Sequence, residues 1–193
     1  MASDNDFARL VSLACHDLRT PLATVSGFAR TLERAGLDEP GARYAETIRA
    51  AADQLAELLE ELSLAARIEA GRYEPTLTDA DTAGLARAAA EALGPERVGV
   101  SGAGGRVRVD AQAAERAVCA LARCALRHGG LERVEVVADG PELAIAPITK
   151  ASAPVVLGEE LRDLGAAVAV RAIAALGGSV SLDGETLEVR LPT

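Results

Sequence analysis

The stretch CHDLRTPLATV, residues 15–25, places a polar cluster inside a long helical apolar repeat. Apolar side chains recur through and around it in alternating steps of four and three, at Val11, Cys15, Leu18, Leu22, Val25, Ala29 and Leu32. This spacing is typical of the heptad seam along which one helix packs against another. We therefore predict a long helix from residue 4 to about residue 35.

A second repeat of the same kind follows the turn GLDEPG, residues 36–41. Its members are Ala45, Ile48, Ala52, Leu55, Leu59, Leu62 and Ala66. Two such helices predict an antiparallel hairpin. A helix of about 30 residues is roughly 45 Å long, and a lone hairpin buries only part of seams of that length. We therefore expect a homodimer that closes a four-helix bundle.

The polar cluster centres on His16, which lies about 100° around the helix from the seam residue Cys15. Thr20 lies one turn later on the same face, where its hydroxyl could reach water or a phosphoryl group. Asp17 could polarise the imidazole, and Pro21 removes a backbone donor and should bend the helix. The alternative is that these are inert surface residues beside a harmless kink.

The sequence pattern changes near residue 75, after Gly71 and Pro75 interrupt the heptad repeat. We expect helices over residues 82–93, 111–128 and 159–175, and strands at RVRVD, RVEVVAD, ELAIA, GSVSLDG and TLEVRLP. The glycines of SGAGGRV are interpreted as a turn. This mixture predicts an α+β sandwich of helices on one face of a largely antiparallel sheet. The domains are then 1–75 and 76–193.

Composition excludes several classes of function. With a formal charge of −9, a single lysine and no tryptophan, the chain lacks the basic patches and stacking surfaces of a nucleic-acid binder. Its three cysteines form no CxxC pair, so neither a zinc site nor a disulfide framework is indicated, and we expect reduced, buried thiols. Since no signal peptide or membrane-spanning segment is evident, we expect a cytoplasmic protein that does not contact the membrane.

The motif HDLRTPL, residues 16–22, resembles the phosphoacceptor box of bacterial sensor histidine kinases. The segment RIEAGRYEPTLTD, residues 67–79, is similar to the end of the second helix and the linker in that family. The resemblance implies that His16 carries the phosphoryl group and that Asp17 assists its transfer. It further implies that Thr20 positions water to hydrolyse a partner's aspartyl phosphate, and that Pro21 has a structural role at the site.

The resemblance continues into the second domain but departs at its nucleotide-binding boxes. The helix VDAQAAERAVCALARCALRHGG, residues 109–130, is similar to the helix that binds magnesium in the family. The two asparagines of that helix fall on Ala120 and Cys124 in this chain. An alanine offers no ligand and a thiol is a soft one, whereas Mg²⁺ prefers oxygen donors. We expect Cys124 to be a buried apolar residue.

The family's adenine-binding aspartate and two glycines align with residues that cannot replace them, at Thr149, Ala151 and Ala153. In the second glycine box, Leu161 and Asp163 replace glycines. The segment between Pro154 and Leu161 is too short for a lid. These departures predict a degenerate ATP-binding (Bergerat-like) domain, with no nucleotide, cofactor or metal bound by this chain.

The combination resembles phosphorelay phosphotransferases of the ChpT-like type, which pair a helical hairpin with a degenerate ATPase domain. It implies that His16 accepts phosphate from a receiver-domain aspartate of a response regulator or hybrid kinase and passes it on. The partner receiver domain would supply Mg²⁺. Arg19 and Thr24 would contact that receiver domain. A non-catalytic scaffold that binds a response regulator or kinase is the alternative, and an active kinase is a third.

Overall fold

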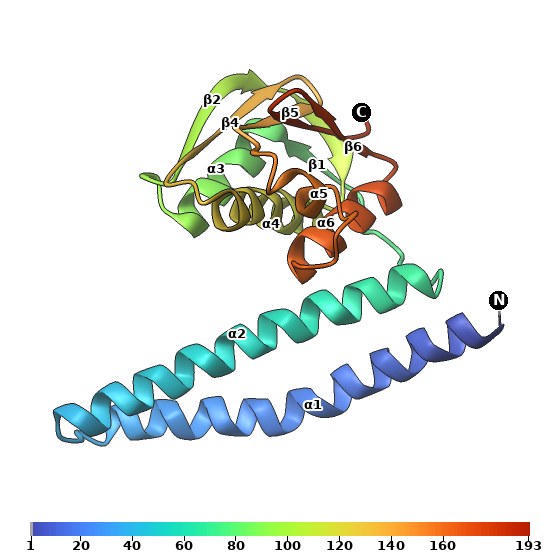
Figure 1. The fold of residues 1–193 in the computed structure, drawn as a ribbon. Helices are drawn as coiled ribbons and strands as arrows, with labels where there is room; N and C mark the ends of the chain where they lie inside the picture. The colour runs from blue at the N-terminus through green and yellow to red at the C-terminus, as the bar shows by residue number, and fades with distance from the viewer. Residues whose placement is uncertain (1) are drawn as a thin grey trace. The chain divides into compact units, whose positions relative to one another are not determined.

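The computed structural model describes residues 2–193 and divides into two compact units, Met1–Arg72 and Tyr73–Thr193. The first unit is a helical hairpin and the second is an α/β domain (Figure 1). The predicted fold class, a helical hairpin followed by a sheet domain, is confirmed. Within residues 2–193, none of the helices combines the length and apolar character needed to cross a bilayer.

The hairpin consists of α1 (Ala2–Arg34) and α2 (Glu39–Glu69). Asp38 caps α2, since its carboxylate accepts a hydrogen bond from the backbone N–H of Gly41 at 3.2 Å, and a proline in the first turn favours the helix start. Arg49 links the two helices: its Nε donates to Glu33 on α1 at 2.9 Å, and its Nη1 donates to Asp53 on α2 at 3.1 Å. The short loop makes the two helices antiparallel, and the ion pair between Arg49 and Glu33 joins them.

Only part of each heptad seam is buried inside the hairpin. The small members of the seams are buried between the helices, and these are Cys15, Ala29, Ala45, Ala52 and Ala66. Of the large members, Val11, Leu22 and Leu59 are half-buried. The other large members are exposed, and these are Leu18, Val25, Leu32, Ile48, Leu55 and Leu62. Small buried residues allow the two backbones to approach closely, and each helix carries an apolar strip that the hairpin leaves in contact with solvent.

The second unit contains two sheets. Its strands are β1 (Thr78–Asp81), β2 (Val98–Gly104), β3 (Arg106–Val109), β4 (Val134–Asp139), β5 (Glu142–Ala146), β6 (Ser179–Asp183) and β7 (Thr186–Arg190). The main sheet has the order β2-β4-β5-β7-β6, and β1 pairs with β3 in a small sheet of its own. The helices are α3 (Thr82–Leu93), α4 (Ala111–Gly129), α5 (Ala153–Val156) and α6 (Leu164–Ala175).

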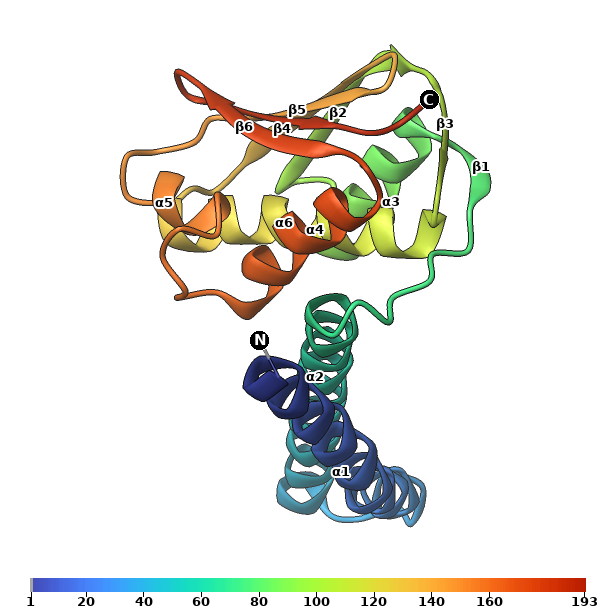
Figure 2. The same cartoon turned by 90° about the vertical axis from the view of Figure 1, so that its right-hand side faces the viewer.

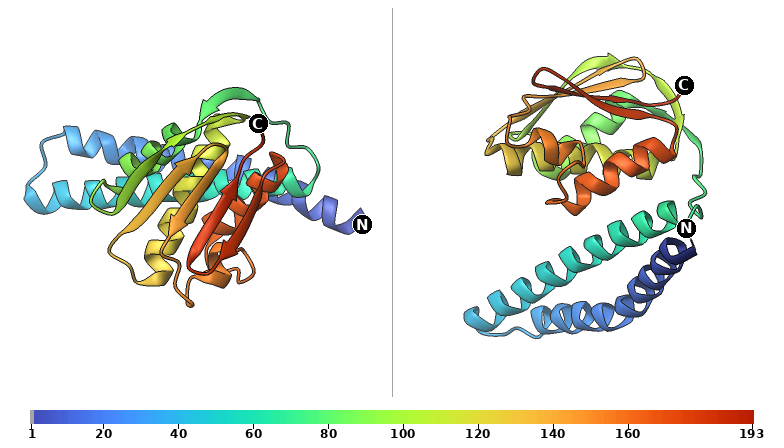
Figure 3. Two further views of the ribbon diagram at one scale, coloured as in Figure 1. Left: turned by 90° about the horizontal axis from the view of Figure 1, so that it is seen from above. Right: turned by 45° about the vertical axis from the view of Figure 1, so that its right-hand side comes forward.

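The helices cover one face of the main sheet (Figure 2). Looking onto the other face, the strands lie in front with α4 and α6 behind them (Figure 3, left). The strands alternate accordingly: Val134 and Val136 of β4 face the helices and are buried, while Val137 is exposed. The core lies between this face and α3, α4 and α6.

The structure corrects two local predictions and contains two further elements that were not expected. The glycine segment SGAGGRV, expected to be a turn, contributes residues 101–104 to strand β2, which pairs in parallel with β4, with an irregularity between Ser101 and Gly104. Gly102 is needed there because it has φ of +95°, and a Cβ would collide with the carbonyl oxygen of Ala138. Strand β1 and helix α5 were not predicted, and α6 begins at Leu164 instead of residue 159.

Candidate functional site

His16 lies on the solvent-facing side of α1. Its side chain is 78% exposed, whereas that of the preceding Cys15 is buried against α2 at 1% exposure. Because Cys15 fixes the seam side of the helix, the imidazole next to it is directed away from the hairpin interior. His16 is therefore accessible to another protein.

Asp17 holds the imidazole by one of its nitrogens. Oδ1 of Asp17 lies 3.2 Å from Nδ1 of His16, and the carboxylate is itself 68% exposed. In the tautomer that places the proton on Nδ1, the carboxylate accepts that proton's hydrogen bond and Nε2 keeps its lone pair. The arrangement leaves Nε2 as the nucleophilic atom and sets a negative charge beside the ring as positive charge develops on it.

The other predicted site residues follow within two turns of α1. Thr20 lies about 40° around the helix from His16, on the same exposed flank. Pro21 lies inside α1 and removes one backbone donor. Thr24 donates its hydroxyl to the carbonyl oxygen of Thr20 at 3.1 Å, so the helix just past Pro21 has a side-chain bond in addition to its backbone bonds. In the right-hand view of Figure 3, α1 curves along its length.

Arg19 and Thr24 flank the histidine face. By helical geometry Arg19 lies roughly 60° from His16 on one side and Thr24 roughly 80° on the other, and both are exposed. The sequence-predicted residues of the first domain therefore share one accessible surface of α1.

In the second domain, Thr149, which aligns with the family's adenine-binding aspartate, bonds to Ser152. Thr149 and Ser152 form a closed turn in which the backbone N–H of Thr149 donates to Oγ of Ser152 at 3.1 Å, and the hydroxyl of Ser152 donates to the carbonyl of Thr149 at 3.2 Å. This turn begins α5, which packs against α4 and α6. Val155 and Val156 of α5 are buried in the core. The segment that aligns with the start of the family's lid is therefore part of the core.

Asp163 occupies the N-terminus of α6. Its Oδ1 accepts a hydrogen bond from the backbone N–H of Ala166 at 3.0 Å. A helix N-terminus attracts anions through its free N–H groups, and here the chain's own carboxylate takes that place. Leu161, at the other replaced glycine, is 73% exposed.

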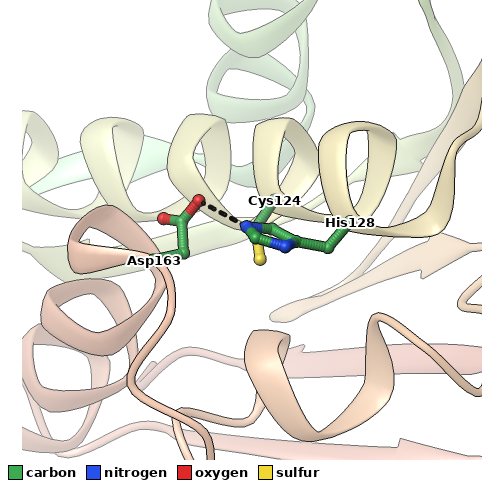
Figure 4. A group of neighbouring side chains, drawn as sticks. All are labelled: Cys124, His128 and Asp163. Atoms are coloured by element: carbon green, nitrogen blue, oxygen red, sulfur yellow. Dashed lines mark hydrogen bonds and ion pairs between the residues drawn. The ribbon is translucent and has the colours of Figure 1, made fainter.

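The structure also brings together three residues that the sequence analysis did not group. Cys124 and His128 of α4 meet Asp163 at the start of α6, with Nε2 of His128 3.2 Å from Oδ2 of Asp163 (Figure 4). Cys124 is fully buried, and burial, followed by the negative charge of Asp163, raises the pKa of its thiol to about 12. The spacing of four residues in Cys124-x-x-x-His128 was a usable signal, but the sequence separation of Asp163 hid the third member.

Comparison with known proteins supports the assignment of the hairpin. Residues 8–71 match the His Kinase A (phospho-acceptor) domain. Sensor protein DivL of Caulobacter vibrioides is 40% identical over 75 residues, which are 38% of this chain and 9% of DivL. The probable sensor histidine kinase TcrY of Mycobacterium tuberculosis is 33% identical over 72 residues, 37% of this chain and 15% of TcrY. The chain spans less than a sixth of the length of either relative.

Solved structures extend the likeness to both domains. Full-length ShkA, solved in complex with AMPPNP, superposes with a TM-score of 0.70 at 24% identity, over 94% of this chain and 44% of that one. The ATP binding domain of PrrB from Mycobacterium tuberculosis gives a TM-score of 0.50 at 25% identity, over 61% of this chain and 97% of that one. The chain therefore has a sensor-histidine-kinase-like core, in which a phospho-acceptor hairpin precedes a domain with the fold of histidine kinase ATPase domains.

Proposed function

We propose that this chain is a histidine phosphotransfer protein of a two-component phosphorelay, which takes a phosphoryl group from a receiver-domain aspartate onto His16 and passes it on without using ATP. The observation that carries the proposal is the exposed imidazole of His16 with Asp17 at its Nδ1, on a hairpin that matches a phospho-acceptor domain. The more specific likeness to ChpT-like phosphotransferases is part of this proposal.

The proposed transfer step starts from the contact between His16 and Asp17. Nε2 of His16 attacks the phosphorus of the receiver's aspartyl phosphate, the N–P bond forms, and the P–O bond to the receiver's aspartate breaks. That aspartate leaves as a carboxylate with the bonding electron pair. Asp17 stabilises the charged ring through the Nδ1–H bond, and the reverse reaction passes the phosphoryl group to a second receiver. The Mg²⁺ that neutralises the phosphoryl oxygens belongs to the receiver.

Three features of the second domain support independence from ATP. Val155 and Val156 take up core volume in the segment that stands in the place of the family's lid. The carboxylate of Asp163 caps α6, where a triphosphate would meet a negative charge instead of a free helix N-terminus. Neither Ala120 nor Cys124 supplies an oxygen for Mg²⁺.

The surface beside His16 supplies the docking site in this proposal. Arg19 and Thr24 contact the receiver, and Thr20 orients a water molecule for hydrolysis of the receiver's phosphoaspartate. The exposed apolar strip along the hairpin pairs with a second copy to form a four-helix bundle. A cytoplasmic location agrees with the three free cysteines.

The test is to incubate the purified chain separately with γ-labelled ATP and with a labelled phospho-receiver. We expect label on the chain only from the receiver, and none on the His16→Gln variant. Label taken from ATP would make the chain a kinase. If cognate receivers bind but leave no label on His16, and His16→Gln signals normally in cells, the chain is a scaffold.

A further inference from the structure

Three potential metal ligands converge between α4 and α6, remote in sequence from the phospho-acceptor helix. Sγ of Cys124, an imidazole nitrogen of His128 and a carboxylate oxygen of Asp163 all lie within 4.8 Å of one another (Figure 4). Cys124 and His128 are four residues apart and so share one face of α4. Asp163 is fixed independently, because its other oxygen caps α6.

The spacing of these atoms approaches that of a tetrahedral metal centre. With Zn–N and Zn–O bonds of about 2.0–2.1 Å, two ligands of a tetrahedral zinc ion lie roughly 3.3 Å apart. Nε2 of His128 and Oδ2 of Asp163 are already 3.2 Å apart. A Zn–S bond of about 2.3 Å requires a nitrogen–sulfur separation of roughly 3.6 Å. The sulfur lies no more than 4.8 Å from the other ligand atoms, so binding an ion requires it to move by at most about 1.2 Å.

The three side chains favour some metal ions over others, and they favour a metal site over a nucleophilic triad. A thiolate with an imidazole and one carboxylate suits Zn²⁺ and other borderline-soft ions, and not Mg²⁺ or Ca²⁺. The same three residue types could form a nucleophilic triad, but an activated cysteine needs a lowered pKa, and burial raises that of Cys124. The raised pKa does not oppose metal binding, because a thiol that coordinates a divalent metal ion loses its proton.

We propose that Cys124, His128 and Asp163 form a Zn²⁺ site that joins α4 to the start of α6, with water as the fourth ligand. His128 is 20% exposed and Asp163 13% exposed, which gives the ion a path from solvent and the water its place. Binding releases the proton of the Cys124 thiol to solvent. The site stabilises the second domain, and the proposal departs from the expectation, drawn from cysteine spacing and from the lost magnesium ligands, that the chain holds no metal. The proposal does not depend on phosphotransfer.

The test titrates the purified, chelator-treated chain with Co²⁺ and Zn²⁺. With Co²⁺ we expect one ion per chain, visible absorption of tetrahedral intensity and a near-ultraviolet thiolate-to-cobalt band. Zn²⁺ should abolish both bands by displacement and raise the Tm. Cys124→Ala should remove the near-ultraviolet band, and His128→Gln and Asp163→Asn should each weaken Zn²⁺ binding by about 100-fold or more. Asparagine still caps a helix, so Asp163→Asn keeps α6 intact.

The matched control is Cys119→Ala, which removes a second buried thiol of α4 outside the cluster. It should bind both ions as the wild type does. The proposal is overturned if the wild type shows no thiolate-to-cobalt band, if the band survives in Cys124→Ala, or if Cys119→Ala is the variant that loses it. Should Cys124→Ala not fold, unchanged Zn²⁺ affinity of both His128→Gln and Asp163→Asn overturns it equally.

Discussion

The contact between His16 and Asp17 joins neighbours in the sequence, so it exists wherever α1 is formed and needs no second domain. Because both side chains are largely exposed, the pair adds little to stability. Its value is chemical: it selects which ring nitrogen is free. This is also why the motif could be identified from the sequence, whereas the triad of Cys124, His128 and Asp163 depends on the packing of α6 against α4.

Replacement of Asp17 by asparagine should therefore change the rate and not the fold. The amide oxygen of the asparagine can still accept a hydrogen bond from Nδ1 of His16, but it no longer offers a negative charge to the ring. We expect the initial rate of phosphoryl transfer from a labelled phospho-receiver to fall by about 100-fold, with the Tm unchanged. Asp79→Asn makes the same change of net charge on an exposed residue of β1 and should transfer at the wild-type rate. Equal rates for the two variants would contradict the role given to Asp17.

Cys124 makes the metal-free protein sensitive to alkali. Its pKa rises from 9.0 to about 12 on folding, so above pH 9 the unfolded chain loses a proton that the native state retains. The contribution to stability is complete below pH 9 and is lost towards pH 12, at roughly 1.4 kcal/mol per pH unit. Urea unfolding at increasing pH, with chelator present, should show a steeper loss for wild type and Cys119→Ala than for Cys124→Ala. Parallel curves for all three would refute this.

At the scale of elements, the parts that could be predicted from the sequence are those with a clear period. Two long heptad seams predicted α1 and α2, and alternation predicted β4, β5, β6 and β7. Strand β2 was missed because three of its seven residues are glycines, which pack against β4 in place of side chains that would mark a strand. The short helix α5 spans only four residues, too few to show a helical repeat in the sequence, and it follows directly on the turn closed by Thr149 and Ser152.

The hairpin seam tolerates only small residues where it is buried. Ala52 is 2% exposed between α1 and α2, so a leucine there must push the helices apart. We expect Ala52→Leu to lower the free energy of unfolding by about 1–3 kcal/mol, measured by urea denaturation followed by circular dichroism. Ala50→Leu lies on the exposed side of the same turn and should change it by less than about 0.5 kcal/mol. A leucine tolerated equally at both positions would show that the two helices are not in close contact.

For the whole molecule, the exposed half of the seam predicts association. Leu55 is 53% exposed on α2, in line with Ile48 and Leu62. A glutamate in the centre of a bundle interface would be buried as an unpaired charge, so Leu55→Glu should convert a dimer to monomers in analytical ultracentrifugation. Leu161→Glu introduces the same charge at an exposed leucine of the second domain and should leave the dimer intact. A wild-type chain that sediments as a monomer would contradict the dimer.

The buried valines of α5 also make it costly for this chain to evolve a nucleotide-binding cavity in that segment. Opening a cavity where Val155 and Val156 lie would remove both from the core, at several kcal/mol together. That is a large fraction of the 5–15 kcal/mol by which a domain is usually stable. A mutational route to a nucleotide cavity in this segment would therefore need stabilising substitutions elsewhere first, whereas the surface of the second domain is free to diverge without that cost.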